Sequence, residues 1–228
     1  MIFDPIYLLF IAPGALLSLV ATILLKYWNS KYSKMANTTG YTGAQAADII
    51  AQKYGYGIGL QQIGGTLSDH YDPRGKIVSL SSDISNRNSI AAVAIAAHEM
   101  GHVQQDFTKN PLLAFRGVLV PAVNIGSQLG IILIIAGLVL AFAGLAWVGL
   151  ILFSLTFLFS FLTLPVEIDA SRRALKMIKE MNLLTASEID GARKVLAAAA
   201  LTYIAAMLTS LGNVLYYALL ISGMGKKD

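Results

Sequence analysis

The chain has 228 residues, of which 56% are hydrophobic and only 13% are charged. One soluble core of this size cannot hide so much apolar surface, so the composition indicates a membrane protein. The net charge is +4, but the sequence has no basic stripe interleaved with aromatic residues, so we expect no nucleic-acid partner. Because cysteine is absent, a transition metal would have to be bound by His, Asp or Glu.

Four apolar stretches are long enough to cross a bilayer as helices, which takes about 20 residues. The predicted spans cover residues 5–28, 118–143, 145–164 and 197–222, with a break near Gly144. No small-residue cleavage signal follows the first stretch, so we interpret it as an anchor rather than a signal peptide. The fourth follows a helix start at Ser187. We therefore predict a mainly α-helical integral membrane protein with about four transmembrane helices.

Charge predicts the orientation of the polar segments 29–111 and 165–196. Nine Lys and Arg residues lie from Lys26 to Arg116, six lie from Arg172 to Lys194, and two are Lys226 and Lys227. Two spans separate the polar segments, so both face one side, and the positive-inside rule makes that side the cytoplasm. We thus expect a multi-pass protein of the cell membrane with a cytoplasmic site. The two C-terminal lysines would then face outward, in conflict with this rule. The alternative is that the fourth stretch is re-entrant, or packs over the site, and does not cross the membrane.

The polar segment 29–111 is predicted to be a small cytoplasmic α+β module. Thr42 is a candidate N-cap of a helix that ends at Gly57. DHYDPRG, residues 69–75, has turn chemistry, and KIVSLSS after it alternates as a short strand does. The next helix is predicted to begin near Asn86 or Asn88.

That helix contains AAHEMGHVQQD, with two of the chain's three histidines. Residues four apart lie on one helix face, so His98 and His102 can bind one zinc ion. Glu99 would lie beside the metal and take a proton from a zinc-bound water. The alternative is a pair of core histidines satisfied by neighbours. The spacing and the short buried run IAAVAIAA before it favour an HExxH zinc helix within the soluble module.

A catalytic zinc usually has three protein ligands, so one further residue is needed. It must be His70 or a carboxylate, and the best carboxylate is Glu167 in LPVEIDASRRAL, where the third span ends. The alternative for Glu167 is an exposed acid or an ion pair with Arg172 or Arg173. Asp169 would hold the free nitrogen of a zinc histidine, or would be a solvated helix acid.

DHYDPR, KIVSLS, SIAAVAIAAHEMGHVQQD and PVEIDASRRAL together resemble the YugP-like neutral zinc metallopeptidases of bacterial membranes. This family is similar to the HtpX-type membrane proteases, in which HExxH and a glutamate on a second helix bind zinc. The resemblance implies that Glu167 is the third ligand of one catalytic zinc ion. HtpX-type proteins have an aspartate four residues after that glutamate, where this chain has Ser171, and the acid here is Asp169.

Several other residues are candidates for substrate contacts. His70 could stabilise the oxyanion of the tetrahedral intermediate, or could be a turn residue bonded locally within DHYDP. Arg172 and Arg173 compete for the same electrostatic role. A substrate peptide could add to an edge strand, or this strand could be purely structural. The candidate edge-strand residues are Lys76, Ile77, Val78 and Ser79.

The function predicted from these features is a zinc-dependent endopeptidase that acts on membrane or membrane-proximal polypeptides. A site-2-type intramembrane protease is disfavoured, because the motif helix is not a span and no LDG sequence occurs. A noncatalytic zinc scaffold, or a regulator of another membrane protease, remains open and would have a closed fourth ligand. A regulatory membrane partner or an oligomer is compatible with either function.

Overall fold

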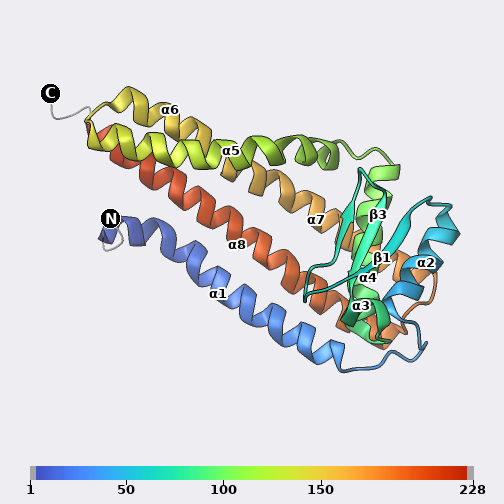
Figure 1. Cartoon of the computed structure of the whole chain (residues 1–228). Helices are drawn as coiled ribbons and strands as arrows, with labels where there is room; N and C mark the ends of the chain where they lie inside the picture. The colour runs from blue at the N-terminus through green and yellow to red at the C-terminus, as the bar shows by residue number, and fades with distance from the viewer. Residues whose placement is uncertain (1–3, 225–228) are drawn as a thin grey trace. The chain divides into compact units, whose positions relative to one another are not determined.

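The computed structural model describes residues 4–224, and most of them are helical, as predicted. The helices are α1 (Pro5–Ser33), α2 (Gly43–Tyr54), α3 (Ser82–Asn86), α4 (Ile90–Phe107), α5 (Pro111–Val139), α6 (Ala143–Phe153), α7 (Leu155–Glu180) and α8 (Ala186–Met224). The strands are β1 (Gly59–Ile63), β2 (His70–Asp72) and β3 (Ile77–Ser81), and Figure 1 shows all these elements along the chain.

Four helical stretches in the described residues are long and apolar enough to cross a membrane. They are Pro5–Ser33, Pro111–Val139, Ala143–Glu180 and Ala186–Met224. The expected number of candidate spans is therefore confirmed, while the precise limits of each span stay predictions. Lys226 and Lys227, which bear on the orientation of the last stretch, lie outside the described residues.

The break between the second and third apolar stretches lies slightly before its predicted position. Helix α5 ends at Val139 and α6 begins at Ala143, so Gly144 is already helical. The turn contains Ala141 in the left-handed region, with φ of 50°, and the Phe142 N–H donates to the Gly137 carbonyl. The chain therefore reverses without a glycine at the left-handed position.

The chain divides into two compact units. Within the described residues, unit 1 comprises residues 4–20, 114–165 and 201–224, and unit 2 comprises residues 21–113 and 166–200. Unit 1 holds most of the apolar helical sequence. Unit 2 holds the three strands, α2, α3 and α4, and the polar part of α7, so every candidate site residue belongs to unit 2.

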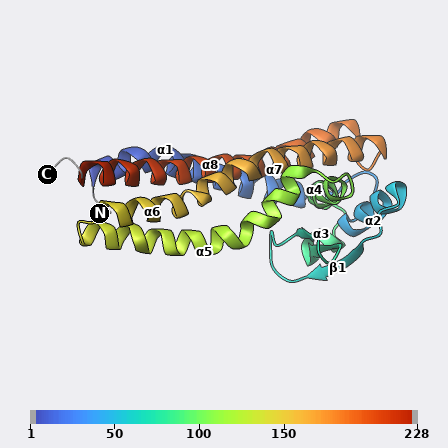
Figure 2. The same ribbon diagram turned by 90° about the horizontal axis from the view of Figure 1, so that it is seen from above.

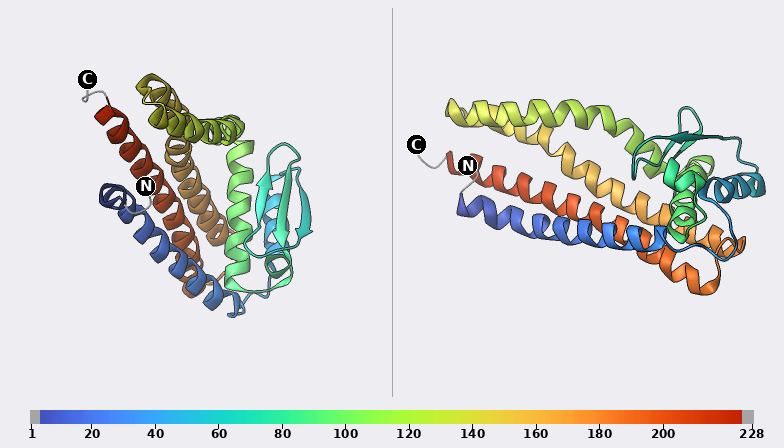
Figure 3. Two further views of the ribbon diagram at one scale, coloured as in Figure 1. Left: turned by 60° about the vertical axis from the view of Figure 1, so that its left-hand side comes forward. Right: turned by 60° about the horizontal axis from the view of Figure 1, so that its bottom comes forward.

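Small residues allow the helices of unit 1 to pack closely. A Cβ atom at Gly130 of α5 would lie 2.6 Å from the Phe153 backbone nitrogen, and one at Gly149 of α6 would lie 2.6 Å from the Ile134 nitrogen. Figure 3 shows α5 running back along α6 and α1 beside α8. Such approaches of helix backbones through glycine are common between helices that pack in a membrane.

The sheet of unit 2 has the strand order β1-β3-β2 (Figure 1). Strand β1 pairs with β3 in parallel, and β2 pairs with β3 antiparallel. The prediction that Ile77, Val78 and Ser79 form an edge strand is therefore wrong, because neighbours on both sides occupy the hydrogen-bonding groups of β3. Lys76 precedes the strand with φ of 53°. The outer strands are β1 and β2.

The helices of unit 2 begin and end close to their predicted limits. Thr42 caps α2, as predicted, and forms a capping box with Gln45, but the helix ends at Tyr54 with Gly55 as its C-cap, two residues before the predicted glycine stop at Gly57. Helix α4 begins after the N-cap Ser89, whose side chain accepts from the Ala92 N–H. The predicted starts at Asn86 and Asn88 are therefore slightly early, because the short helix α3 occupies the chain up to Asn86.

Helix α4 forms the centre of the unit 2 core. The small side chains of its first turns are completely buried, including Ala92, Ala94 and Ala96, and they pack in one cluster with Ile50 of α2 and Leu80 of β3. Figure 2 shows α4 nearly end-on, with α2, α3 and β1 around it. A helix surrounded by other elements is a rigid support for a functional site.

Candidate metal centre

Two neighbouring elements of unit 2 supply the three residues that could hold a metal ion. His98 and His102 are one turn apart on α4, and their ring centroids are 4.9 Å apart. Glu167 lies on α7 and is only 2% exposed. One ligand atom from each of these residues lies within 4.8 Å of the others, so the three form a group among the described residues that could hold a metal ion.

A glycine inside the motif allows α7 to approach α4. Gly101 lies between the two histidines, and a Cβ atom there would overlap the backbone carbonyl of Ala170. Ala170 is itself completely buried, three residues after Glu167. Any larger residue at position 101 would push the helices apart and carry the Glu167 carboxylate away from the imidazoles.

The two distances from the Glu167 oxygen to the imidazole nitrogens are close to those of tetrahedral zinc coordination. Glu167 Oε2 lies 3.2 Å from His98 Nε2 and 3.5 Å from His102 Nε2. With metal–ligand bonds of about 2.0–2.1 Å, the edges of a tetrahedron are about 3.3–3.4 Å long. Two imidazoles and one carboxylate, together with an open fourth position, are also a common donor set for catalytic zinc. These residues therefore fit a zinc ion.

The second nitrogen of each imidazole has its own hydrogen-bond partner. His98 Nδ1 lies 3.2 Å from Ser171 Oγ, and His102 Nδ1 lies 2.9 Å from Gln105 Oε1. Both Nε2 atoms therefore point toward Glu167. Hydrogen bonds of this kind orient metal-binding histidines and increase their basicity.

The electrostatics of the site favour a positive charge. Burial lowers the pKa of His102, but the hydrogen bond and charge of Glu167 and the charge of Glu99 raise it above its ordinary value overall. Glu99 is 7% exposed and follows His98 directly. Because a site that stabilises an imidazolium also attracts a divalent cation, the surroundings of His102 suit a metal.

Asp169 and Arg173 are connected to the metal-site histidines through Gln105. The prediction that Asp169 holds a zinc histidine directly is wrong, since its Oδ2 accepts from Gln105 Nε2 at 2.8 Å and from Arg173 Nε at 2.7 Å. Arg173 also donates to the Gln104 side chain, while Arg172 is exposed.

His70 and Lys76 lie outside the three-residue cluster. His70 is exposed at the start of β2, and its Nδ1 lies 2.8 Å from the Ser68 carbonyl oxygen, so it has the local turn bond that was its alternative explanation. Lys76 forms an ion pair with Asp106, which also accepts from the Tyr71 hydroxyl at 2.6 Å. These contacts join β2 and the residue before β3 to the end of α4.

Sequence reasoning missed Gln105 and Ser171 as partners of the imidazoles. A signal existed for each: Gln105 lies three residues after His102 and so on the same side of the helix. Ser171 occupies the position where HtpX-type proteins have an aspartate. Neither signal could show which ring nitrogen each side chain would contact, because that depends on how α4 and α7 pack.

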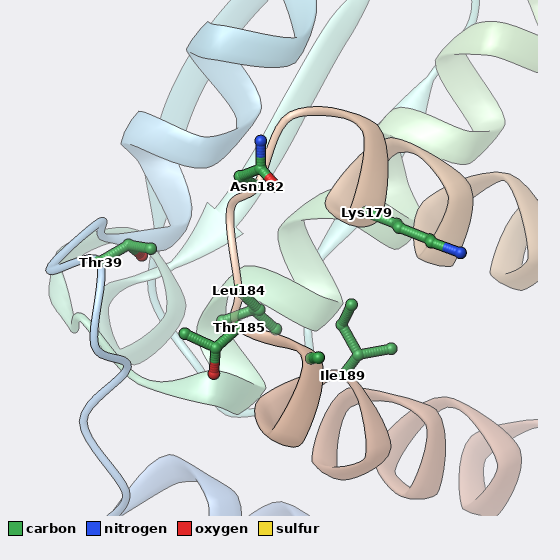
Figure 4. A pocket seen from close by; sticks show the side chains of 7 residues that line it. Thr39, Lys179, Asn182, Leu184, Thr185 and Ile189 are labelled. Atoms are coloured by element: carbon green, nitrogen blue, oxygen red, sulfur yellow. The ribbon is translucent and has the colours of Figure 1, made fainter.

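A separate pocket of about 460 Å³ lies near the turn between α7 and α8 (Figure 4). It is lined by Thr39, Lys179, Asn182, Leu184, Thr185, Ala186 and Ile189. None of the metal-binding candidates is among these residues, and Lys179 is the ionisable side chain in the lining. The pocket lining has no second ionisable side chain to combine with that lysine, so the candidate metal centre remains the best-supported functional site.

The described residues define a helical protein with four candidate membrane spans and an HExxH group, completed by a glutamate, that could hold a metal. Residues 7–222 match the family model described as "Putative neutral zinc metallopeptidase". The chain therefore belongs to this zinc metallopeptidase family. It is 38% identical over 210 residues to the "Putative membrane protease YugP" of Bacillus subtilis (strain 168), covering 88% of this chain and 93% of that protein. No solved structure matches the chain.

Proposed function

We propose that this protein is a membrane zinc endopeptidase that hydrolyses membrane or membrane-proximal polypeptides on the cytoplasmic side. The observation that carries the proposal is the convergence of His98 Nε2, His102 Nε2 and Glu167 Oε2, with the buried Glu99 next to them. Three ligands leave a fourth position open, as in catalytic zinc sites. A structural zinc would need a closing fourth ligand, and His70 is not in the group.

The chemistry can be divided between the metal and the chain. A zinc ion held by these residues would act as a Lewis acid on the scissile carbonyl and lower the pKa of a bound water to about 7. Glu99 accepts a proton from the attacking water as the new C–O bond forms. It then donates this proton to the leaving amine nitrogen as the C–N bond breaks, which is general base followed by general acid catalysis.

The outer strand β2 is our candidate for substrate contacts in place of β3. An extended peptide can add to the free edge of a sheet through backbone hydrogen bonds, which suits substrates of varied sequence. Tyr71 in β2 is bonded to Asp106 at the end of the metal-binding helix, so β2 is fixed to the element that carries His98 and His102. Side chains of the substrate would then determine the cleavage preference.

The proposed activity predicts a strict dependence on zinc. The protein purified in detergent should contain about one zinc ion per chain and should cleave unfolded or membrane-derived polypeptides. Removal of the metal with a chelator should abolish cleavage, and equimolar zinc should restore it. If the chain binds zinc but cleaves none of a broad set of substrates, the noncatalytic scaffold becomes the better explanation.

The cytoplasmic orientation of the site gives a separate prediction. Cysteine introduced at Thr66 or at Ser187 should resist a membrane-impermeant thiol reagent in intact cells, because the positive-inside rule places both polar segments in the cytoplasm. Both residues are exposed, and the chain contains no native cysteine that would give a background signal.

Ala141→Cys is the matched control, since this exposed residue lies in the turn between α5 and α6 and is expected on the outer side. It should be labelled in intact cells, whereas all three cysteines should be labelled after the membrane is permeabilised. Labelling of Thr66→Cys or Ser187→Cys in intact cells would show that the proposed orientation is wrong.

A further inference from the structure

Gln105 lies at the centre of the contact between α4 and α7. Its side chain is completely buried, an unusual environment for an uncharged amide. The amide makes three hydrogen bonds: Oε1 lies 2.9 Å from His102 Nδ1, and Nε2 lies 2.8 Å from both the Val166 carbonyl oxygen and Asp169 Oδ2. Both donor positions of the amide nitrogen and one acceptor position of the oxygen are thus used.

These partners determine which way the amide faces. The Val166 carbonyl and the Asp169 carboxylate can only accept hydrogen bonds, so the group between them must be the amide NH₂. The amide oxygen of Gln105 is therefore the atom next to His102. An amide oxygen cannot donate, and Nδ1 of His102 must carry a hydrogen to bond to it.

We propose that Gln105 is a positioning residue that holds His102 in the Nδ1–H form, so that its Nε2 lone pair is free to bind the metal. This inference rests on the proposed metal site but concerns a residue outside the ligand set. The carboxylate of Asp169 acts through Gln105, because it accepts from the amide and is itself held by Arg173. The order of contacts is thus Arg173, Asp169, Gln105 and His102.

The other imidazole has a less specific partner. Ser171 Oγ lies 3.2 Å from His98 Nδ1, and a hydroxyl can either donate or accept. Ser171 therefore permits both neutral forms of the His98 ring, whereas Gln105 permits one form of the His102 ring. The two metal-binding histidines are consequently fixed to different degrees, and substitution of Gln105 should affect the metal site more than substitution of Ser171.

The first test is measured on the wild-type protein, and two variants serve only to assign its signals. The chain has three histidines, and ¹⁵N labelling of histidine gives three ring systems in the zinc-loaded protein. His70→Ala removes one signal, and Ser171→Ala identifies His98 by perturbing it. We expect His102 to carry hydrogen on Nδ1 and to bind zinc through Nε2. Zinc bound through Nδ1 of His102 would overturn the inference.

The second test measures zinc affinity by competition with a chromophoric chelator. Gln105→Met keeps the length of the side chain but removes the acceptor, and zinc should bind about 10- to 100-fold more weakly. The double variant Gln105→Glu with Asp169→Asn keeps an acceptor for the Nδ1 hydrogen and avoids a contact between two carboxylates, so it should bind zinc more tightly than Gln105→Met. Gln104→Met is the matched control, because Gln104 is the adjacent glutamine and its side-chain oxygen accepts from Arg173, whereas that of Gln105 contacts His102. It should bind zinc as the wild type does.

The outcomes separate this inference from the proposed function. If the wild type binds no zinc, the proposed function fails. If the wild type binds zinc but folded Gln105→Met binds it equally well, only the role of Gln105 is wrong. Equal losses in folded Gln105→Met and in the folded double variant would indicate a packing role, and would also contradict the inference.

Discussion

Glu99→Gln should retain zinc and lose peptide hydrolysis by a factor of at least about 10², and by up to about 10⁴. The amide is nearly isosteric with the carboxylate and leaves both imidazoles and Glu167 in place, so the metal site should persist. It cannot accept a proton from the attacking water, however. The measurements are zinc content and the initial rate of cleavage at saturating substrate, which reports the chemical step separately from binding.

The matched control for this variant is Glu180→Gln. It makes the same chemical change on α7, at an exposed residue that is not in the metal-binding group. Its rate should stay close to that of the wild type. A zinc-loaded Glu99→Gln protein that cleaves nearly as fast as the wild type would show that Glu99 is not the base, whatever the metal does.

Loss of any one proposed ligand should remove zinc from the site. We expect His98→Ala, His102→Ala and Glu167→Ala each to weaken zinc binding by more than about 100-fold, the upper range for residues that only support ligands. Glu167→Ala should act as strongly as the histidine variants, because its Oε2 lies within 3.5 Å of both Nε2 atoms. Zinc content of the purified proteins and competition with a chelator measure the effect.

His70→Ala is the control for the two histidine variants, since His70 is exposed and bonded within its own loop. It should retain stoichiometric zinc. If Glu167→Ala also retains stoichiometric zinc while His98→Ala does not, the third ligand has been assigned wrongly. Asp169→Ala and the His70 variant would then identify the residue that takes its place.

The local parts of the molecule could be predicted from the sequence because they depend on short spacings. Long apolar runs predicted the four candidate spans, and Thr42 predicted the start of α2. The separation of His98 from His102 by four residues places both on one face of any α-helix, so half of the metal-binding group follows from helix geometry alone. Glu99 lies beside them because it directly follows His98 in the same helix.

Glu167 could be proposed from its chemistry and from a family resemblance, but only the tertiary structure brings it to the histidines. It lies 69 residues after His98 in the chain. Its contact with the histidines requires α7 to approach α4 closely, which is possible because Gly101 has no Cβ atom to overlap Ala170. Hydrogen bonds to Nδ1 of His102 and His98 likewise depend on the packing of α4 against α7. No spacing within one helix contains that information.

The order of the strands in the sheet is another feature that local sequence patterns did not predict. Alternation in KIVSLSS predicted a strand, and β3 is one, but its central position was not predicted. Whether a strand is central or at an edge depends on which segments pair with it, and β1 joins β3 in parallel from 18 residues earlier in the chain. Periodicity determines the conformation of a segment, whereas its neighbours are selected by burial and hydrogen bonding across the whole unit. The helices and the HExxH face therefore follow from local sequence patterns, whereas the third candidate ligand, the partners of the imidazoles and the outer strands of the sheet depend on how distant segments pack.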